Sequence, residues 1–252
     1  MSIKSALIAR NAKIDELVNQ FNSLYEGIAP GVKREVQALF RKGVFNQDVI
    51  KNVFTDAGFD DLYGGFVDKF DDIIKQGNAV GKAMGIGFPL TEKNYNILDA
   101  LASQVETRFA VSQASFISSM TDSAMMHRIG GGKFTDIVAD MSKAFEGSGR
   151  RFAAEAQTGI NQFNNAVNYQ MFDEAGVERW IYFGPLDEKT RDSCTATKTD
   201  PNQETGWTAE QVESSQTPFI EAGGYNCRHE WLAYVGELKE PEVIKIRGGE
   251  QV

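Results

Sequence analysis

The chain contains few of the residues that usually carry reactive chemistry. It has two cysteines and two histidines among 252 residues. Two cysteines are too few for a disulfide scaffold, so a reducing compartment is the simpler expectation, at least during folding. No uncharged apolar run reaches the roughly 18 residues of a membrane-spanning helix. The N-terminal MSIKSALIARNAKIDELVNQ lacks the unbroken apolar stretch of a secretory signal and predicts the start of a helix.

Basic residues are also fewer than acidic ones. The chain has 26 Lys and Arg against 35 Asp and Glu, for a net charge of −9. A free-standing nucleic-acid binder normally presents a basic face, so binding through bulk charge is excluded, while a weak, local contact with DNA stays open. The composition, 42% hydrophobic and 24% charged, is that of a globular protein with enough length for one large domain or two small ones.

The first part of the chain predicts helices. Apolar residues recur at helical spacing from Leu7 to Tyr25, and Gly27 with Pro30 indicates that this helix stops. Asn46 is placed to cap a later, shorter helix.

A glycine-rich segment, GNAVGKAMGIGFP at residues 77–89, predicts a loop or hinge. Thr91 can then cap an unusually long helix that runs towards Met126. Two more helices are expected around residues 134–145 and 152–172.

The residue composition of the chain changes after Gly176. β-Branched and aromatic residues at 177–183 predict a strand, and residues 230–235 and 243–246 predict two more. Residues 187–194 predict a short helix. We therefore predict an α+β protein, in which a long-helix N-terminal region is followed by a small α+β C-terminal module. The expected boundaries are 1–176 for the helical region, with its hinge at 77–89, and 177–252 for the module with a C-terminal tail.

The chemically distinctive residues lie in this module, which holds both cysteines, all three tryptophans and one histidine. Cys227 and His229 are two apart, so on a strand they point to one face. With Cys194, and Asp187 as a fourth ligand, they could bind zinc. This is the one cofactor that the residues suggest.

Three other interpretations stay open. A Cys194–Cys227 disulfide would close a long loop and stabilise the module. Alternatively the cysteines are buried thiols, Arg228 pairs with Asp187 or a backbone carbonyl, and His229 is a hydrogen-bonded structural residue. A cysteine nucleophile with His229 as its base is a further hypothesis, but no second base or oxyanion motif accompanies it.

Two short elements of the module resemble a known family. FGPLDEKTRDSC, followed after a polar stretch by GYNCRHEWLAYV, resembles the C-terminal module of phage minor head proteins of the Mu F-like / SPP1 gp7-like head-morphogenesis family. In many relatives a cysteine or histidine follows the first element, where this chain has Thr197, and prolines precede the second, where it has Gly223-Gly224-Tyr225. The matching residues are Leu186, Asp187, Thr190, Arg191 and Cys194 in the first element, and Asn226, Cys227, Arg228 and His229 in the second.

This resemblance implies a structural virion protein of a tailed phage and not an enzyme. Such a minor head protein is associated with the portal or the capsid interior and aids DNA packaging or ejection. Its expected partners are the portal protein, the major capsid protein, packaged DNA through weak contacts, and further copies of itself, with no membrane in the mature particle. It would reside in the head interior or at the portal vertex of the virion, and in the host cytoplasm during assembly.

Two alternatives to this function stay open. One is a nucleic-acid-processing enzyme, a metal-independent nuclease in which Arg191, Arg228 and His229 contact and protonate a phosphodiester. The other is a zinc-stabilised adaptor without catalytic residues.

Overall fold

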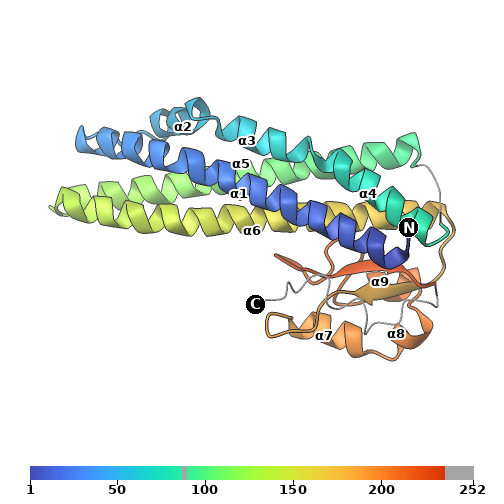
Figure 1. Cartoon of the computed structure of the whole chain (residues 1–252). Helices are drawn as coiled ribbons and strands as arrows, with labels where there is room; N and C mark the ends of the chain where they lie inside the picture. Colours follow the sequence, from blue (N-terminus) through green and yellow to red (C-terminus); the bar gives the residue numbers. More distant parts are fainter. Residues whose placement is uncertain (87–89, 236–252) are drawn as a thin grey trace. The chain divides into compact units, whose positions relative to one another are not determined.

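The computed structural model of the chain describes residues 1–86 and 90–235 (Figure 1). The protein is mostly helical, with long N-terminal helices and a small C-terminal region of short helices around a two-stranded antiparallel sheet, which confirms the predicted fold class. None of the helices in the described ranges combines the length and apolar character needed to cross a bilayer. The elements are α1 (Ile3–Arg41), α2 (Gln47–Asp56), α3 (Phe59–Val67), α4 (Phe70–Ala83), α5 (Glu92–Ile129), α6 (Phe134–Glu174), β1 (Trp180–Phe183), α7 (Asp192–Thr199), α8 (Asn202–Thr205), α9 (Ala209–Glu213) and β2 (Glu230–Ala233).

The sheet joins two of the three predicted strands. β1 and β2 pair antiparallel, with Trp180 opposite Ala233 and Phe183 opposite Glu230. All residues of both strands are buried, as expected for strands covered on both faces. The third predicted strand, at 243–246, lies outside the described residues.

Local capping signals predicted two helix starts. The Asn46 side chain accepts hydrogen bonds from the backbone N–H groups of Asp48 and Val49, at 2.8 and 3.1 Å, and so caps α2. The long helix expected after Thr91 is α5, which begins at the next residue and spans 38 residues.

The predicted stop at Gly27 and Pro30 is wrong, because α1 continues through both residues to Arg41. The penalty for glycine and proline in a helix is about 1 and 3 kcal/mol relative to alanine. Burial of apolar side chains on both sides, such as Tyr25 and Val32, offsets it.

The predicted hinge at 77–89 is wrong over residues 77–83, which belong to α4, while residues 87–89 are outside the described part. Gly77 is needed for packing, since a Cβ there would lie 2.6 Å from Val167 Cγ1. In the same way, the two helices predicted at 134–145 and 152–172 are one helix, α6. The glycines that suggested breaks in α4 and α6 therefore either allow a close contact between helices or are tolerated within the helix.

The chain divides into two compact units, and neither matches the predicted boundary at residue 176. Unit 1 contains Met1–Glu16, Lys69–Ala102 and the described residues from Gln157 onwards, and unit 2 contains Leu17–Asp68 and Ser103–Ala156. The C-terminal module therefore folds together with parts of the helical region.

Unit 2 has an aromatic core. The rings of Tyr63 and Phe109 stack at 4.8 Å with an interplanar angle of 4°, and Phe21 stacks on Phe109 at 5.0 Å. The buried Tyr25 hydroxyl lies 2.7 Å from Ser148 Oγ, so this hydroxyl keeps a hydrogen-bond partner within the core.

Unit 1 contains a buried ion pair that joins β2 to two helices. Arg10 of α1 donates to Glu230 Oε2 at 2.6 Å, and both side chains are almost fully buried. The same oxygen accepts from Asn164 and Asn168 of α6, at 2.9 and 3.0 Å. Charged groups removed from water are stable only when hydrogen bonds replace the lost solvent, and these donors supply them at Glu230 Oε2.

We predict that Glu230→Gln destabilises the protein by about 3 kcal/mol or more, because it leaves the Arg10 guanidinium buried without its counter-charge. Chemical denaturation monitored by circular dichroism measures this. Glu16→Gln, at an exposed pair with Lys13, is the matched control and should cost less than about 1 kcal/mol. Equal effects of the two substitutions would show that the buried pair has no special role.

Candidate functional site

The aromatic residues of the C-terminal module pack together around the sheet. The Trp231 ring lies 4.8 Å from that of Tyr182 and 5.6 Å from that of Trp207, and the Trp180 ring lies 4.5 Å from that of Phe219. This cluster holds the two strands in place and forms one wall of the site described next.

Three candidate ligands meet beside this wall. Cys194, from α7, has its Sγ 3.8 Å from Cys227 Sγ, and the latter lies 3.6 Å from His229 Nδ1. All three ligand atoms are within 4.8 Å of one another, and all three residues are buried. A disulfide bond is about 2.05 Å long, so the two sulfurs are not bonded in this arrangement.

His229 has a defined tautomer. Its Nε2 lies 2.7 Å from the carbonyl oxygen of Pro185, and a carbonyl can only accept a hydrogen bond. Nε2 therefore carries the proton, and in the neutral ring Nδ1 presents its lone pair towards Cys227. The Tyr182 ring stacks on the imidazole with an interplanar angle of 9°, which fixes the orientation of the ring.

The environment of Cys227 favours a thiolate. Its Sγ accepts the backbone N–H groups of Gly223 and His229 at 3.2 and 3.4 Å. The hydrogen bond from Cys194 and the one from the His229 backbone N–H lower the pKa of Cys227, and the thiolate that results raises the pKa of Cys194. The sulfur pair thus holds one negative charge more readily than two when no cation is bound.

Asp187 does not join this group. Its two carboxylate oxygens accept hydrogen bonds from the Arg228 guanidinium at 2.6 and 2.7 Å, and the Lys189 backbone N–H and Thr190 hydroxyl donate to the same carboxylate. Of the four residues predicted as metal ligands, the structure therefore brings three together, and the fourth, Asp187, is paired with the Arg228 guanidinium instead. The Asp187–Arg228 pair is the one that the hypothesis of buried structural residues anticipated.

Arg191 and Asn226 of the two sequence elements also make contacts, within the module and with the α6 helix respectively. The Arg191 guanidinium donates to the carbonyl oxygens of Gly223 and Tyr225. The Asn226 backbone N–H donates to Thr158 Oγ1 at 2.7 Å, and Asn226 itself has a left-handed backbone with φ of 56°. The two elements, separated by some thirty residues of chain, therefore form one structural unit.

Sequence reasoning did not identify the polar face of α6 that supports this unit. Asn161 donates to the Cys227 carbonyl at 2.6 Å, and Asn168 donates to the Trp231 carbonyl at 3.2 Å. The sequence shows only a recurrence of Asn and Thr at helical spacing in an amphipathic helix, and the structure shows that these residues are buried. They are Thr158, Asn161, Asn164, Asn165 and Asn168.

This geometry does not favour phosphodiester chemistry. His229 is buried with both ring nitrogens engaged, and Arg228 is committed to Asp187. A general acid must reach its substrate, and this imidazole does not. The cysteine-nucleophile hypothesis meets the same obstacle, because both thiols are buried.

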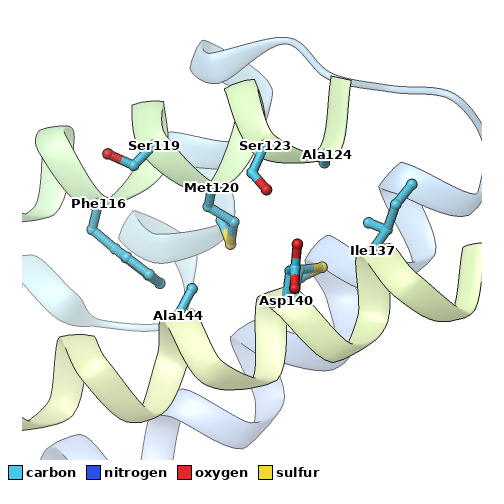
Figure 2. Close-up of a pocket in the computed structure, with 9 residues that line it drawn as sticks. Phe116, Ser119, Met120, Ser123, Ala124, Ile137, Asp140 and Ala144 are labelled. Atoms are coloured by element: carbon cyan, nitrogen blue, oxygen red, sulfur yellow. The ribbon is translucent and has the colours of Figure 1, made fainter. Parts of the chain in front are cut away.

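A separate cavity of about 100 Å³ lies in unit 2 between α5 and α6, and Figure 2 shows its lining. Phe116, Met120 and Ile137 make it mainly apolar, and Asp140 is the one ionisable residue among those that line it. Asp140 is 2.6 Å from His127 Nε2, in a half-exposed pair. Ligand pockets usually measure about 300–1,000 Å³, so this cavity is too small for one.

A scan of the chain against protein-family models finds no match, and searches of curated proteins and of solved structures find none either. The resemblance to phage minor head proteins therefore stays a prediction from the two sequence elements.

We predict that the Asp187–Arg228 pair stabilises the module in a pH-dependent way. Hydrogen bonds from Arg228 hold the pKa of Asp187 well below its ordinary value of 3.8. The stabilisation is therefore complete above that value and is lost as the pH falls towards the folded-state pKa. Because both side chains are partly exposed, Asp187→Asn should cost only about 1 kcal/mol at pH 7.

Denaturation of both proteins between pH 7 and pH 2 measures this difference, which should shrink in the acid range. A difference that stays constant down to pH 2 would show that the lost charge is not the cause.

We also predict that Gly223→Ala disrupts the sulfur site. An added Cβ would lie 2.1 Å from Cys194 Sγ and 2.8 Å from Cys227 Sγ, so the loop or the thiols must move. Overpacking of this kind costs about 1–3 kcal/mol. Gly147→Ala within α6, where no atom lies within 4 Å, should be neutral or slightly stabilising. Thermal unfolding compares the two, and equal melting temperatures would contradict the tight packing at Gly223.

Proposed function

We propose that this chain is a structural virion protein of a tailed phage, a minor head protein associated with the portal or the capsid interior. The observation that supports this proposal is the contact between the two elements that resemble the family. Asp187 of the first pairs with Arg228 of the second, and Cys194 lies beside Cys227. Residues that match a family pattern because they build its fold are expected to meet in space, and these do.

A structural role also agrees with how these residues are used. The guanidinium groups of Arg228 and Arg191 donate hydrogen bonds to other parts of the module, and the His229 ring is buried. Catalytic groups have to be accessible to a substrate, whereas structural groups do not. The same burial weakens the nuclease alternative.

The end of α5 offers a surface for a partner within the virion. Met126 and Ile129 are 69% and 74% exposed there, in unit 2. Large apolar side chains that remain in solvent after folding are frequent at protein interfaces. We propose that such residues contact the portal or the major capsid protein, whose copies surround the chain during assembly in the host cytoplasm and in the finished head.

The net charge of −9 sets a limit on the role of DNA. Attraction between a protein and the phosphate backbone grows with the number of basic contacts. Contact with packaged DNA is therefore proposed to be weak and local, and any help in packaging or ejection would act through the protein partners.

The test is quantitative mass spectrometry of purified full particles and procapsids of the phage that encodes the chain, with the portal protein as internal standard. We expect a reproducible ratio of this chain to portal in full particles. Presence in procapsids but absence from full particles would mean an assembly factor, and absence from both would refute a virion role.

A variant separates an interface from general stability. Ile129→Asp should lower the ratio to portal without lowering the melting temperature, because Ile129 is exposed. Ile8→Asp, at a residue of α1 that is 44% exposed, is the control and should be incorporated normally.

A further inference from the structure

Two of the distances among the two thiols and the imidazole of the C-terminal module match those around a tetrahedral metal, and all three ligand atoms lie within 4.8 Å of one another. With zinc–sulfur bonds of about 2.3 Å and a zinc–nitrogen bond of about 2.0–2.1 Å, tetrahedral geometry requires a sulfur–sulfur distance of about 3.8 Å and a sulfur–nitrogen distance of about 3.6 Å. The Cys194–Cys227 and Cys227–His229 ligand atoms are 3.8 and 3.6 Å apart. These two distances are too long for a bond and match the edges of such a tetrahedron.

The hydrogen bonds around these ligands are the ones that a metal site requires. His229 donates its Nε2–H to the Pro185 carbonyl, which leaves Nδ1 as the coordinating atom. Outer contacts of this type fix the ring of metal-binding histidines. Two backbone N–H groups, from Gly223 and from His229 itself, point at Cys227 Sγ and stabilise the thiolate form that binds a metal.

A fourth group faces the sulfurs. The Tyr182 hydroxyl lies 3.4 Å from Cys194 Sγ and 3.9 Å from Cys227 Sγ, and the residue is fully buried. A zinc–oxygen bond of about 2.0–2.2 Å would place an oxygen ligand roughly 3.5 Å from each sulfur.

We propose that Cys194, Cys227 and His229 bind one structural zinc ion, with the Tyr182 hydroxyl at the fourth position. Soft thiolates with an imidazole select zinc over calcium or magnesium, which prefer oxygen ligands. Two thiolates neutralise the charge of the ion, so the buried centre carries no net charge. Burial of the ligands leaves no open position for a substrate, which makes the site structural.

The ion would join three segments that the chain order keeps apart. Tyr182 belongs to β1, Cys194 to α7, and Cys227 and His229 to the segment that leads into β2. Because the ligands come from separate segments, the free energy of metal binding would add to the stability of the fold. This inference does not depend on the proposed virion role, since it is tested on the purified chain.

The experiment is metal analysis of the full chain, purified under reducing conditions without chelator. We expect about one zinc ion per chain, and a melting temperature that falls after chelation and recovers on addition of zinc. Less than about 0.2 zinc per chain before and after reconstitution would overturn the proposal. An intact mass and thiol count showing a Cys194–Cys227 disulfide in the freshly purified, unreduced chain would also overturn it.

Variants identify the ligands. His229→Ala and Cys194→Ser should weaken zinc affinity at least about tenfold, whereas His127→Ala, at the other histidine of the chain, should retain it. Equal zinc affinity of His229→Ala and His127→Ala, measured by competition with a chelator, would overturn the assignment.

Cobalt(II) titration of the unmodified chain gives an answer even if these variants do not fold. Tetrahedral cobalt bound by two thiolates shows sulfur-to-metal charge-transfer bands, and their absence would contradict the site.

A second use of cobalt tests Tyr182 as the fourth ligand. Tyr182→Phe should keep the charge-transfer bands but change the ligand-field spectrum. Tyr225→Phe, at an exposed tyrosine, should leave both unchanged. An unchanged spectrum in Tyr182→Phe would remove Tyr182 from the fourth position.

Discussion

The buried pair of Arg10 and Glu230 is the interaction on which the architecture of unit 1 depends. Removing both charges from water is costly, and the pair is stable because Glu230 Oε2 accepts three hydrogen bonds, one from Arg10 and two from α6 asparagines. The position of β2 is fixed by this requirement. Since Glu230 directly follows His229, the pairing of Glu230 with Arg10 also fixes the position of the segment that carries Cys227 and His229.

In the segment from Cys227 to Glu230, four consecutive residues all have side chains that contact other parts of the protein. Cys227 and His229 face Cys194 and Tyr182, Arg228 reaches across to Asp187, and Glu230 connects with the long helices. Three of these partners, Tyr182, Asp187 and Cys194, lie in the β1–α7 part of the chain, whereas Glu230 is bound by α1 and α6. Gly223 completes the arrangement, because only a residue without a Cβ can place its backbone against both sulfurs.

These contacts support one picture of the module, in which the distinctive residues build a stable structural unit. A cluster whose hydrogen bonds are satisfied internally is poorly suited to bind a substrate and well suited to hold a fold together. The proposed zinc ion would likewise stabilise the fold, by joining β1, α7 and the segment that leads into β2.

The sequence by itself determined the mostly helical N-terminal part, the caps at Asn46 and Thr91, the two described strands and the pairing of Asp187 with Arg228 as one of its alternatives. Periodicity and capping are local properties, so they can be read from neighbouring residues. Only the tertiary structure decided that α1 passes through Pro30, that Gly77 packs on Val167, and that Asp187 lies apart from the sulfurs. The role of Arg10 and the α6 asparagines was also decided there, because burial and long-range hydrogen bonds depend on segments distant in the chain, which no local pattern records.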